Sequence, residues 1–231
     1  GTWSLMGVEV KEPIVNEQSL ANNFTNEGGV CGTYRFLKNI MGLWLVQQCR
    51  RSFRRAGNEY SYDELTEMAR TAKPLQAFID PDADEFMNPP DMPGAIQDFC
   101  RRTNQPVPDT EAALIRCCLE SLALKYRWTV DRLKEITGRP ARVIHMVGGG
   151  TQNELLCQLA ADATGLPVVA GPIEATAAGN ILMQAMALGD IKSLEEARQL
   201  IRRSFPVKVY EPHAKGPWDD VYGKFNDLVV N

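Results

Sequence analysis

The sequence has 231 residues, of which 44% are hydrophobic and 23% charged, and its formal net charge is −4. This composition is typical of a globular protein, and the length allows one large domain or two small ones. No apolar run approaches the ~18 residues that a membrane span needs, and no signal-peptide pattern opens the chain. The acidic balance argues against a nucleic-acid partner. We therefore expect a cytoplasmic protein that binds neither nucleic acid nor membrane.

The cysteines and histidines do not follow a metal-binding pattern. Six cysteines and two histidines occur, no two cysteines have C-x-x-C spacing, and His145 lies far from His213 in the sequence. This spacing predicts no metal site. Because a chain of this size can bury a core without disulfides, we expect free thiols in a reducing compartment.

The first residues, GTWSLMGVEV, predict a strand over residues 2–10 that starts without a leading polar segment or an initiator methionine. This beginning is typical of a fragment of a longer protein. Residues 11–35 are polar and contain several glycines, which favours strands and turns over helix. Residues 38–55 have an apolar face and a basic end, which predicts a helix.

The middle of the chain is predicted to be helical. Ser61 and Glu64 have the spacing of a capping box at a helix start. Residues 79–93 are rich in proline and acidic residues, which predicts a surface loop. Two helices are expected next, over residues 93–104 and over residues 110–127, where the pattern continues to Gly138.

Strands and helices alternate from residue 142 onward. RVIHMV is expected to be a short buried strand, the residues after it a helix, and LPVVA the next strand. Two helices, a short strand over VKVYEP and a terminal helix are expected to follow. This order predicts an α/β fold in which RVIHMV and LPVVA are neighbouring strands. Small residues line one face of the helix over residues 174–188. We expect that face to pack closely, so that Gly179→Leu would overpack the contact.

Three glycines, residues 148–150, separate the strand RVIHMV from the helix after it. Such a run makes either a tight turn or a surface that a ligand can approach closely. Walker A spacing is missing, and a dinucleotide fingerprint fails at its third glycine, where Asn153 stands. A dinucleotide or methyl-donor site therefore stays open only as an alternative, with Glu174 as the ribose acid. The amide of Asn153 could equally hold a purine or ribose.

Three blocks of sequence carry a family resemblance. They are GTWSLMG, then NEGG followed by GTYRFLKNIMGLWLVQ, then VGGGTQNELLCQLAADATGLPVVAGPIEATAAGN. Together they closely resemble the C-terminal half of the FGGY family of carbohydrate kinases, within the actin-like ATPase superfamily, from Gly1 to about Leu188. The resemblance implies a ribonuclease-H-like α/β domain with a mixed sheet flanked by helices. Residues 1–231 would form the C-terminal nucleotide-binding domain, and an N-terminal domain of the same protein would be its partner.

The resemblance also implies binding roles for single residues. Thr2 matches a residue at the ATP phosphates, and Gln47 matches one on the nucleotide side. Gly148 and Gly149 match the seat of the adenine or ribose, and Asn153 matches the polar residue beside it. Asn39 matches a residue near the sugar, although a helix cap explains Asn39 equally well. We expect Thr2, Gln47, Gly149 and Asn153 to surround one cleft.

The implied reaction is the ATP- and Mg²⁺-dependent phosphorylation of a ketose. L-rhamnulose is the first candidate for the acceptor, and L-fuculose and xylulose are alternatives. The family's catalytic aspartate would precede Gly1, so we assign no catalytic residue and no metal ligand in this chain and expect it to be inactive alone. A non-catalytic interaction domain is the remaining alternative.

Overall fold

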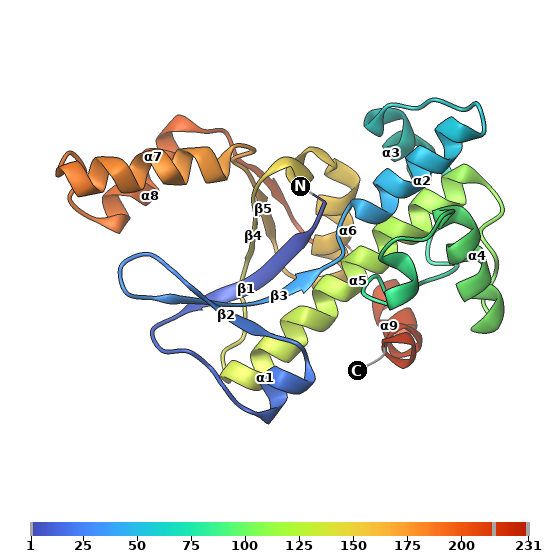
Figure 1. Ribbon diagram of the computed structural model, residues 1–231, viewed down its shortest axis with the longest axis horizontal. Helices are drawn as coiled ribbons and strands as arrows, with labels where there is room; N and C mark the ends of the chain where they lie inside the picture. The colour runs from blue at the N-terminus through green and yellow to red at the C-terminus, as the bar shows by residue number, and fades with distance from the viewer. Residues whose placement is uncertain (1, 214–215, 230–231) are drawn as a thin grey trace.

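The computed structural model describes residues 2–213 and 216–229. In this part of the chain, two three-stranded sheets lie among helices (Figure 1). The first sheet has the order β1-β3-β2 and is antiparallel. Its strands are β1 (Ser4–Val10), β2 (Thr25–Gly28) and β3 (Tyr34–Ile40).

The second sheet has the order β4-β5-β6. Its strands are β4 (Ile144–Met146), β5 (Val168–Ala170) and β6 (Lys208–Tyr210). The pair β4–β5 is parallel and the pair β5–β6 antiparallel. The predicted neighbours RVIHMV and LPVVA are therefore confirmed, as is the mixed α/β character of the fold.

The long helix α5 (Glu111–Thr137) organises the core. It has 27 residues, which is ~40 Å at 1.5 Å per residue. Thr110 caps its first turn, and Gly138, with φ +68°, ends it as predicted. Because helices α3 (Tyr62–Thr71) and α6 (Glu154–Thr164) and strand β1 all pack against it, α5 buries residues around most of its circumference. Helices α2 (Trp44–Arg55) and α4 (Met92–Arg102) extend the same core.

The last described helix, α9 (Gly216–Leu228), packs against α5 and α6. Phe225 is fully buried in the main core. The guanidinium of Arg127 stacks on the Tyr222 ring at 3.9 Å, and the Tyr222 hydroxyl donates to Asp131 at 2.6 Å. These contacts fix the C-terminal helix along the central one.

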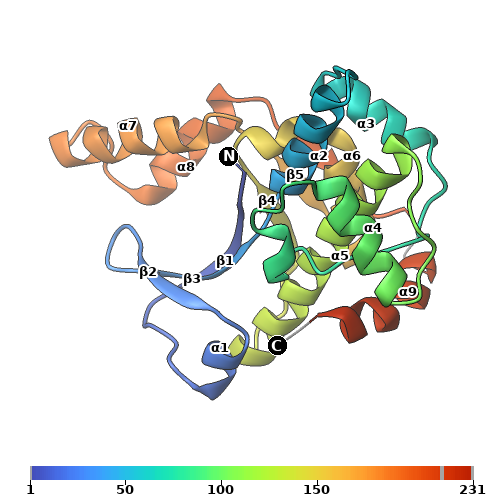
Figure 2. The same ribbon diagram turned by 45° about the vertical axis from the view of Figure 1, so that its right-hand side comes forward.

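Helices α7 (Ala175–Leu188) and α8 (Leu194–Ser204) form a separate unit that projects from the rest in both views (Figures 1 and 2). A small cluster of Leu182, Ile191 and Ala197 holds the two helices together. A Cβ added at Gly179 would meet no described atom within 4 Å. The expected close packing is therefore wrong at Gly179, whereas Ala185 of the same helix packs against this cluster.

Two predicted segments near the start of the chain also need correction. Lys38–Ile40 belong to β3 and not to a helix, since Lys38 and Ile40 are buried and Asn39 between them is exposed, as β-pairing requires. A short helix, α1 (Glu17–Ala21), interrupts residues 11–35. Its capping box, formed by Asn16 and Ser19, has Ser where Glu or Gln is usual.

The first part of the predicted surface loop, residues 79–86, is anchored in the core, whereas residues 87–91 are mostly exposed as expected. Ile79 and Phe86 are fully buried, and Asp80 is 2% exposed because it pairs with a buried lysine. A short 3₁₀ turn (Asp84–Phe86) follows. β4 is less buried than predicted, since His145 is exposed and Val147, which directly follows the strand, is 53% exposed. Among the described helices, none has the length and apolar character to cross a membrane.

Candidate functional site

The glycine run follows β4 and leads into α6. Gly148 has φ +86° and ψ −173°, a conformation that is essentially restricted to glycine. Its N–H donates to the Pro172 carbonyl at 3.0 Å, and its own carbonyl accepts from the Thr151 N–H and hydroxyl. The turn Gly149–Gln152 then runs into the helix. Gly148 is therefore needed for the shape of the turn.

The backbone conformation does not require glycine at Gly149 or Gly150. Neither has a positive φ, and a Cβ added to either would meet no described atom within 4 Å. Local packing in this chain could thus accept a side chain at both positions. Their bare backbone leaves a surface that a flat ring or a sugar can approach closely.

Asn153 caps α6 at the end of this turn. Its Oδ1 accepts from the Leu156 N–H at 2.9 Å, and its Nδ2 donates to the Thr66 hydroxyl of α3 at 3.3 Å. The side chain therefore has a structural role as N-cap. The second Nδ2 hydrogen remains available to a ligand, because an amide carries two donors.

A cavity of about 360 Å³ lies beside the run, between the facing edges of β1 and β4. It is lined by Trp3 and residues 4–8 of β1, by residues 143–147 around β4 and by the three glycines. Leu43 and Tyr126 are among the other lining residues. The Tyr126 hydroxyl is hydrogen-bonded to the Ser4 hydroxyl at 2.7 Å. Burial raises the pKa of Tyr126 to about 12, so its hydroxyl stays neutral at physiological pH.

Thr2 precedes β1 and contacts the start of α2. The Thr2 carbonyl accepts from the Trp44 N–H at 3.1 Å, which joins the start of β1 to the first residue of α2. Gln47 is one turn further along α2 and is half-buried. Its N–H donates to the carbonyl of Leu43, a residue of the cavity wall.

The six residues assigned from the resemblance are brought together only in part. Gly148 and Gly149 line the cavity, and Thr2 directly precedes its first lining residue, Trp3. Gln47 and Asn153 lie outside the cavity lining, on the helices that follow Leu43 and the glycine run. Asn39 is an exposed residue of β3 paired with Leu5, so its interpretation as a helix cap is wrong.

Sequence analysis missed Gly42, which precedes α2. A Cβ there would lie 2.6 Å from the Ser4 hydroxyl oxygen and 2.9 Å from both the Ser4 nitrogen and the Thr2 carbonyl oxygen. Only glycine therefore allows this turn to lie against the start of β1. The available signal was a glycine between two apolar segments in NIMGLW, which can mark a close backbone approach.

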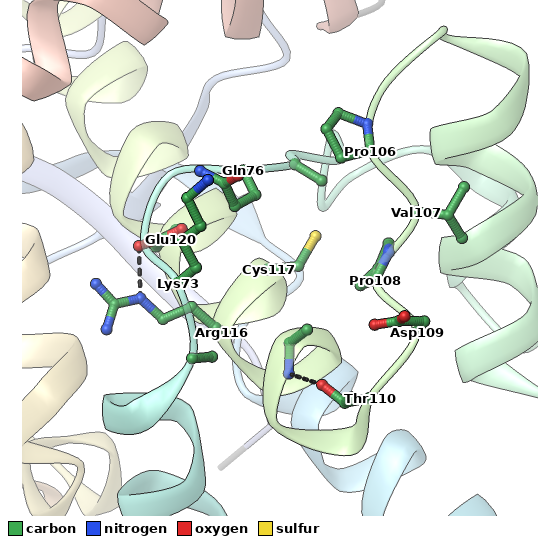
Figure 3. Close-up of a pocket in the computed structure, with 13 residues that line it drawn as sticks. Lys73, Gln76, Pro106, Val107, Pro108, Asp109, Thr110, Arg116, Cys117 and Glu120 are labelled. Atoms are coloured by element: carbon green, nitrogen blue, oxygen red, sulfur yellow. Dashed lines mark hydrogen bonds and ion pairs between the residues drawn. The ribbon is translucent and has the colours of Figure 1, made fainter.

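A second cavity of about 280 Å³ lies between the segment that follows α3, the segment that precedes α5 and the first turns of α5 (Figure 3). Its buried carboxylate, Glu120, already accepts from Arg116 Nε at 2.5 Å and from the Leu75 N–H at 2.8 Å. Burial raises the pKa of Glu120, while Arg116 opposes this shift. Both Glu120 oxygens thus have hydrogen-bond partners within the fold. The Arg116–Glu120 ion pair therefore has a structural role in this cavity.

A family model described as "FGGY family of carbohydrate kinases, C-terminal domain" matches residues 1–188. Since this match covers most of the chain, the chain belongs to the FGGY family of carbohydrate kinases and corresponds to the C-terminal domain.

The chain is also similar to individual rhamnulokinases. It is 48% identical to the Bacteroides thetaiotaomicron rhamnulokinase over 99% of this chain and 46% of the relative. The Bacillus subtilis rhamnulokinase is 45% identical over 92% of this chain and 43% of the relative. The chain therefore spans less than half the length of these curated relatives.

Solved sugar kinases have the same fold. The ligand-bound xylulose kinase from Lactobacillus acidophilus superposes with a TM-score of 0.68 at 15% identity, over 99% of this chain and 45% of that one. Plasmodium falciparum glycerol kinase with ADP gives 0.67 at 14% identity, over 99% and 44%. The actin-like ATPase fold is thereby confirmed.

Proposed function

We propose that the protein containing this chain transfers the γ-phosphate of ATP to the 1-hydroxyl of L-rhamnulose. Residues 1–231 would be its nucleotide-binding domain, working with a sugar-binding N-terminal domain of the same protein. The choice of acceptor is supported by 48% identity to a rhamnulokinase along nearly the whole chain. L-fuculose and xylulose are the acceptors to test against it.

The observation that carries the nucleotide-binding role is the open backbone at Gly149 and Gly150. Both glycines face a cavity, and neither is required by its φ angle or by contacts with described residues. A ribose or adenine lying on this backbone would explain two otherwise unnecessary glycines. We propose that Gly148 shapes the turn, that Gly149 is the seat, and that Asn153 donates its free amide hydrogen to the nucleotide.

The remaining assigned residues would act by position and hydrogen bonding. Phosphoryl transfer depends mainly on alignment and charge neutralisation. The Thr2 hydroxyl would donate to a phosphate oxygen, while its carbonyl stays bound to the Trp44 N–H. Gln47 would contact the nucleotide from the first turns of α2, and exposed Asn39 would face the sugar. The base that deprotonates the sugar hydroxyl would come from residues before Gly1.

The described residues contain no cluster of side chains that would bind magnesium directly. No group of three or more His, Cys, Asp or Glu residues suited to a metal occurs within residues 2–213 and 216–229. Mg²⁺ commonly keeps several waters and binds through substrate phosphates. We propose that it arrives with ATP. The six free thiols agree with a reaction in the reducing cytoplasm.

A coupled ADP-release assay on the complete protein tests this function. L-rhamnulose should give the highest kcat/KM among L-rhamnulose, L-fuculose and xylulose. The 231-residue chain alone should give no sugar-dependent ADP release, because the proposed base is not part of it. A higher kcat/KM for another ketose would contradict the acceptor, and sugar-dependent turnover by the chain alone would contradict the location of the base.

A further inference from the structure

We infer that Asp82 is a positioning residue for Thr2, acting through the turn that joins β3 to α2. This inference rests on the proposed role of Thr2 at the ATP phosphates. Asp82 itself is distant from Thr2 in sequence and belongs to the anchored segment over residues 79–86. It would act by holding the backbone on which Thr2 rests.

The first step is the contact between the turn and Thr2. Gly42 packs so closely on the start of β1 that an added Cβ would lie 2.9 Å from the Thr2 carbonyl oxygen. The same carbonyl accepts from the Trp44 N–H at 3.1 Å. Any shift of residues 41–44 must therefore move the Thr2 backbone or break this hydrogen bond.

The second step is the contact between the turn and Asp82. The Met41 N–H, the first after β3, donates to Asp82 Oδ1 at 2.8 Å. Met41 is 2% exposed, so water cannot readily replace this acceptor. A buried N–H that loses its partner is destabilising, because it gives up its hydrogen bond without regaining one to water. The hydrogen bond from Met41 therefore holds the turn against Asp82.

The third step is the fixation of Asp82. Lys125 of α5, itself 2% exposed, pairs with Asp80 Oδ1 at 2.7 Å and with Asp82 Oδ2 at 3.2 Å. Lys38 of β3 lies 3.8 Å from Asp82 Oδ2 and donates to the Asn22 carbonyl. The two ammonium groups attract Oδ2 electrostatically without a hydrogen bond to it, while Oδ1 accepts from the Met41 N–H.

The anchored segment gives this arrangement a rigid base. The Ile79 N–H donates to the Ser121 hydroxyl of α5 at 3.0 Å, and the Phe86 ring is fully buried. The Trp128 ring of α5 lies beneath both lysines, 4.9 Å from Lys125 Nζ and 5.6 Å from Lys38 Nζ. The central helix is thus connected through Asp82 to the turn and to Thr2.

The experiment compares Asp82→Ala and Asp82→Asn with Glu120→Ala as a matched control. Glu120 also binds one backbone N–H and one cation while buried, but at the second cavity. Asp82→Asn retains an oxygen that can accept from the Met41 N–H. Should Asp82→Ala not fold, Asp82→Ser replaces it, because its shorter side chain cannot span the same distance.

The first readout is amide hydrogen exchange in the 231-residue chain. Asp82→Ala should speed exchange at Met41 and Trp44 about tenfold, whereas Glu120→Ala should leave both within about twofold. Asp82→Asn keeps the acceptor for Met41 but loses the attraction to the two lysines, so its exchange should lie between these values. Unchanged Trp44 exchange in Asp82→Ala would overturn the inference whatever the nucleotide does. Equal acceleration by Glu120→Ala would also overturn it, because the effect would then be general destabilisation.

The second readout is the dissociation constant for MgADP, measured by calorimetry on the same variants. Asp82→Ala should weaken binding about fivefold through misplacement of Thr2, and Glu120→Ala should not. Faster Trp44 exchange with unchanged MgADP affinity would overturn the link from Asp82 to the nucleotide. Absence of MgADP binding by the unsubstituted chain would instead contradict the proposed function, while the exchange result still decides whether Asp82 holds the turn.

Discussion

Two junctions between a strand and a helix contain glycine for opposite reasons. At the first, between β3 and α2, Gly42 lies against the start of β1 and a Cβ would come within 2.9 Å of backbone atoms. At the second, between β4 and α6, Gly149 and Gly150 have no described atom within 4 Å of an added Cβ. The first glycine is required by the fold, and the second pair leaves a surface free. The same residue type therefore identifies packing at one junction and a candidate ligand seat at the other.

Gly42→Val should give the largest effect. Its branched side chain would collide with fixed backbone at Thr2 and Ser4, and overpacking typically costs 1–3 kcal/mol and occasionally more. We expect a loss near 3 kcal/mol in the free energy of unfolding of the chain, measured by urea denaturation. A loss below about 0.5 kcal/mol would show that this junction tolerates side chains as the other does.

Gly148→Ala should come next, because Gly148 differs from its two neighbours in backbone conformation. With φ +86° and ψ −173°, an alanine would be strained by about 2 kcal/mol. The same denaturation experiment on Gly150→Ala is the control, since that position has an ordinary φ and open space. Equal losses of unfolding free energy in the two variants would show that Gly148 is no more required by its backbone conformation than Gly150.

Gly149→Val should affect the nucleotide more than the fold. The side chain would enter open space in the chain, so the free energy of unfolding should change by less than about 0.5 kcal/mol. In the complete enzyme, the KM for ATP should rise at least tenfold, or about 1.4 kcal/mol. The KM for the sugar should change much less. An unchanged ATP KM in the folded variant would contradict the proposed seat.

Gly179→Leu extends the comparison to a glycine inside a helix, and its effect should be the smallest. Because no described atom lies within 4 Å of a Cβ at this position of α7, leucine should raise helix propensity without a clash. We expect the 231-residue chain to gain roughly 0.5–0.8 kcal/mol of stability, measured as a higher melting midpoint. A lower melting midpoint would indicate that this face of α7 is closely packed, as the sequence predicts.

Sequence alone determined the features that depend on nearby residues. The Ser61–Glu64 capping box is present and Gly138 ends α5, both as predicted, because each feature involves residues within a few positions of one another. The alternation after residue 142 was sufficient to pair β4 with β5, and the three sequence blocks indicated the family. Local hydrogen bonding and hydrophobic periodicity carry this information directly.

Only the tertiary structure decided which side chains are anchored and which glycines are free. Lys125 and Asp80 are 45 residues apart, yet their buried ion pair brought the first part of an apparently exposed acidic loop into the core. Residues 38–40 became a strand because β1 supplied its partner. Gly42 and Gly149 look alike in sequence, and they differ in the structure because Thr2 and Ser4 lie against only one of them. Such contacts join distant residues, so no local pattern could have specified them.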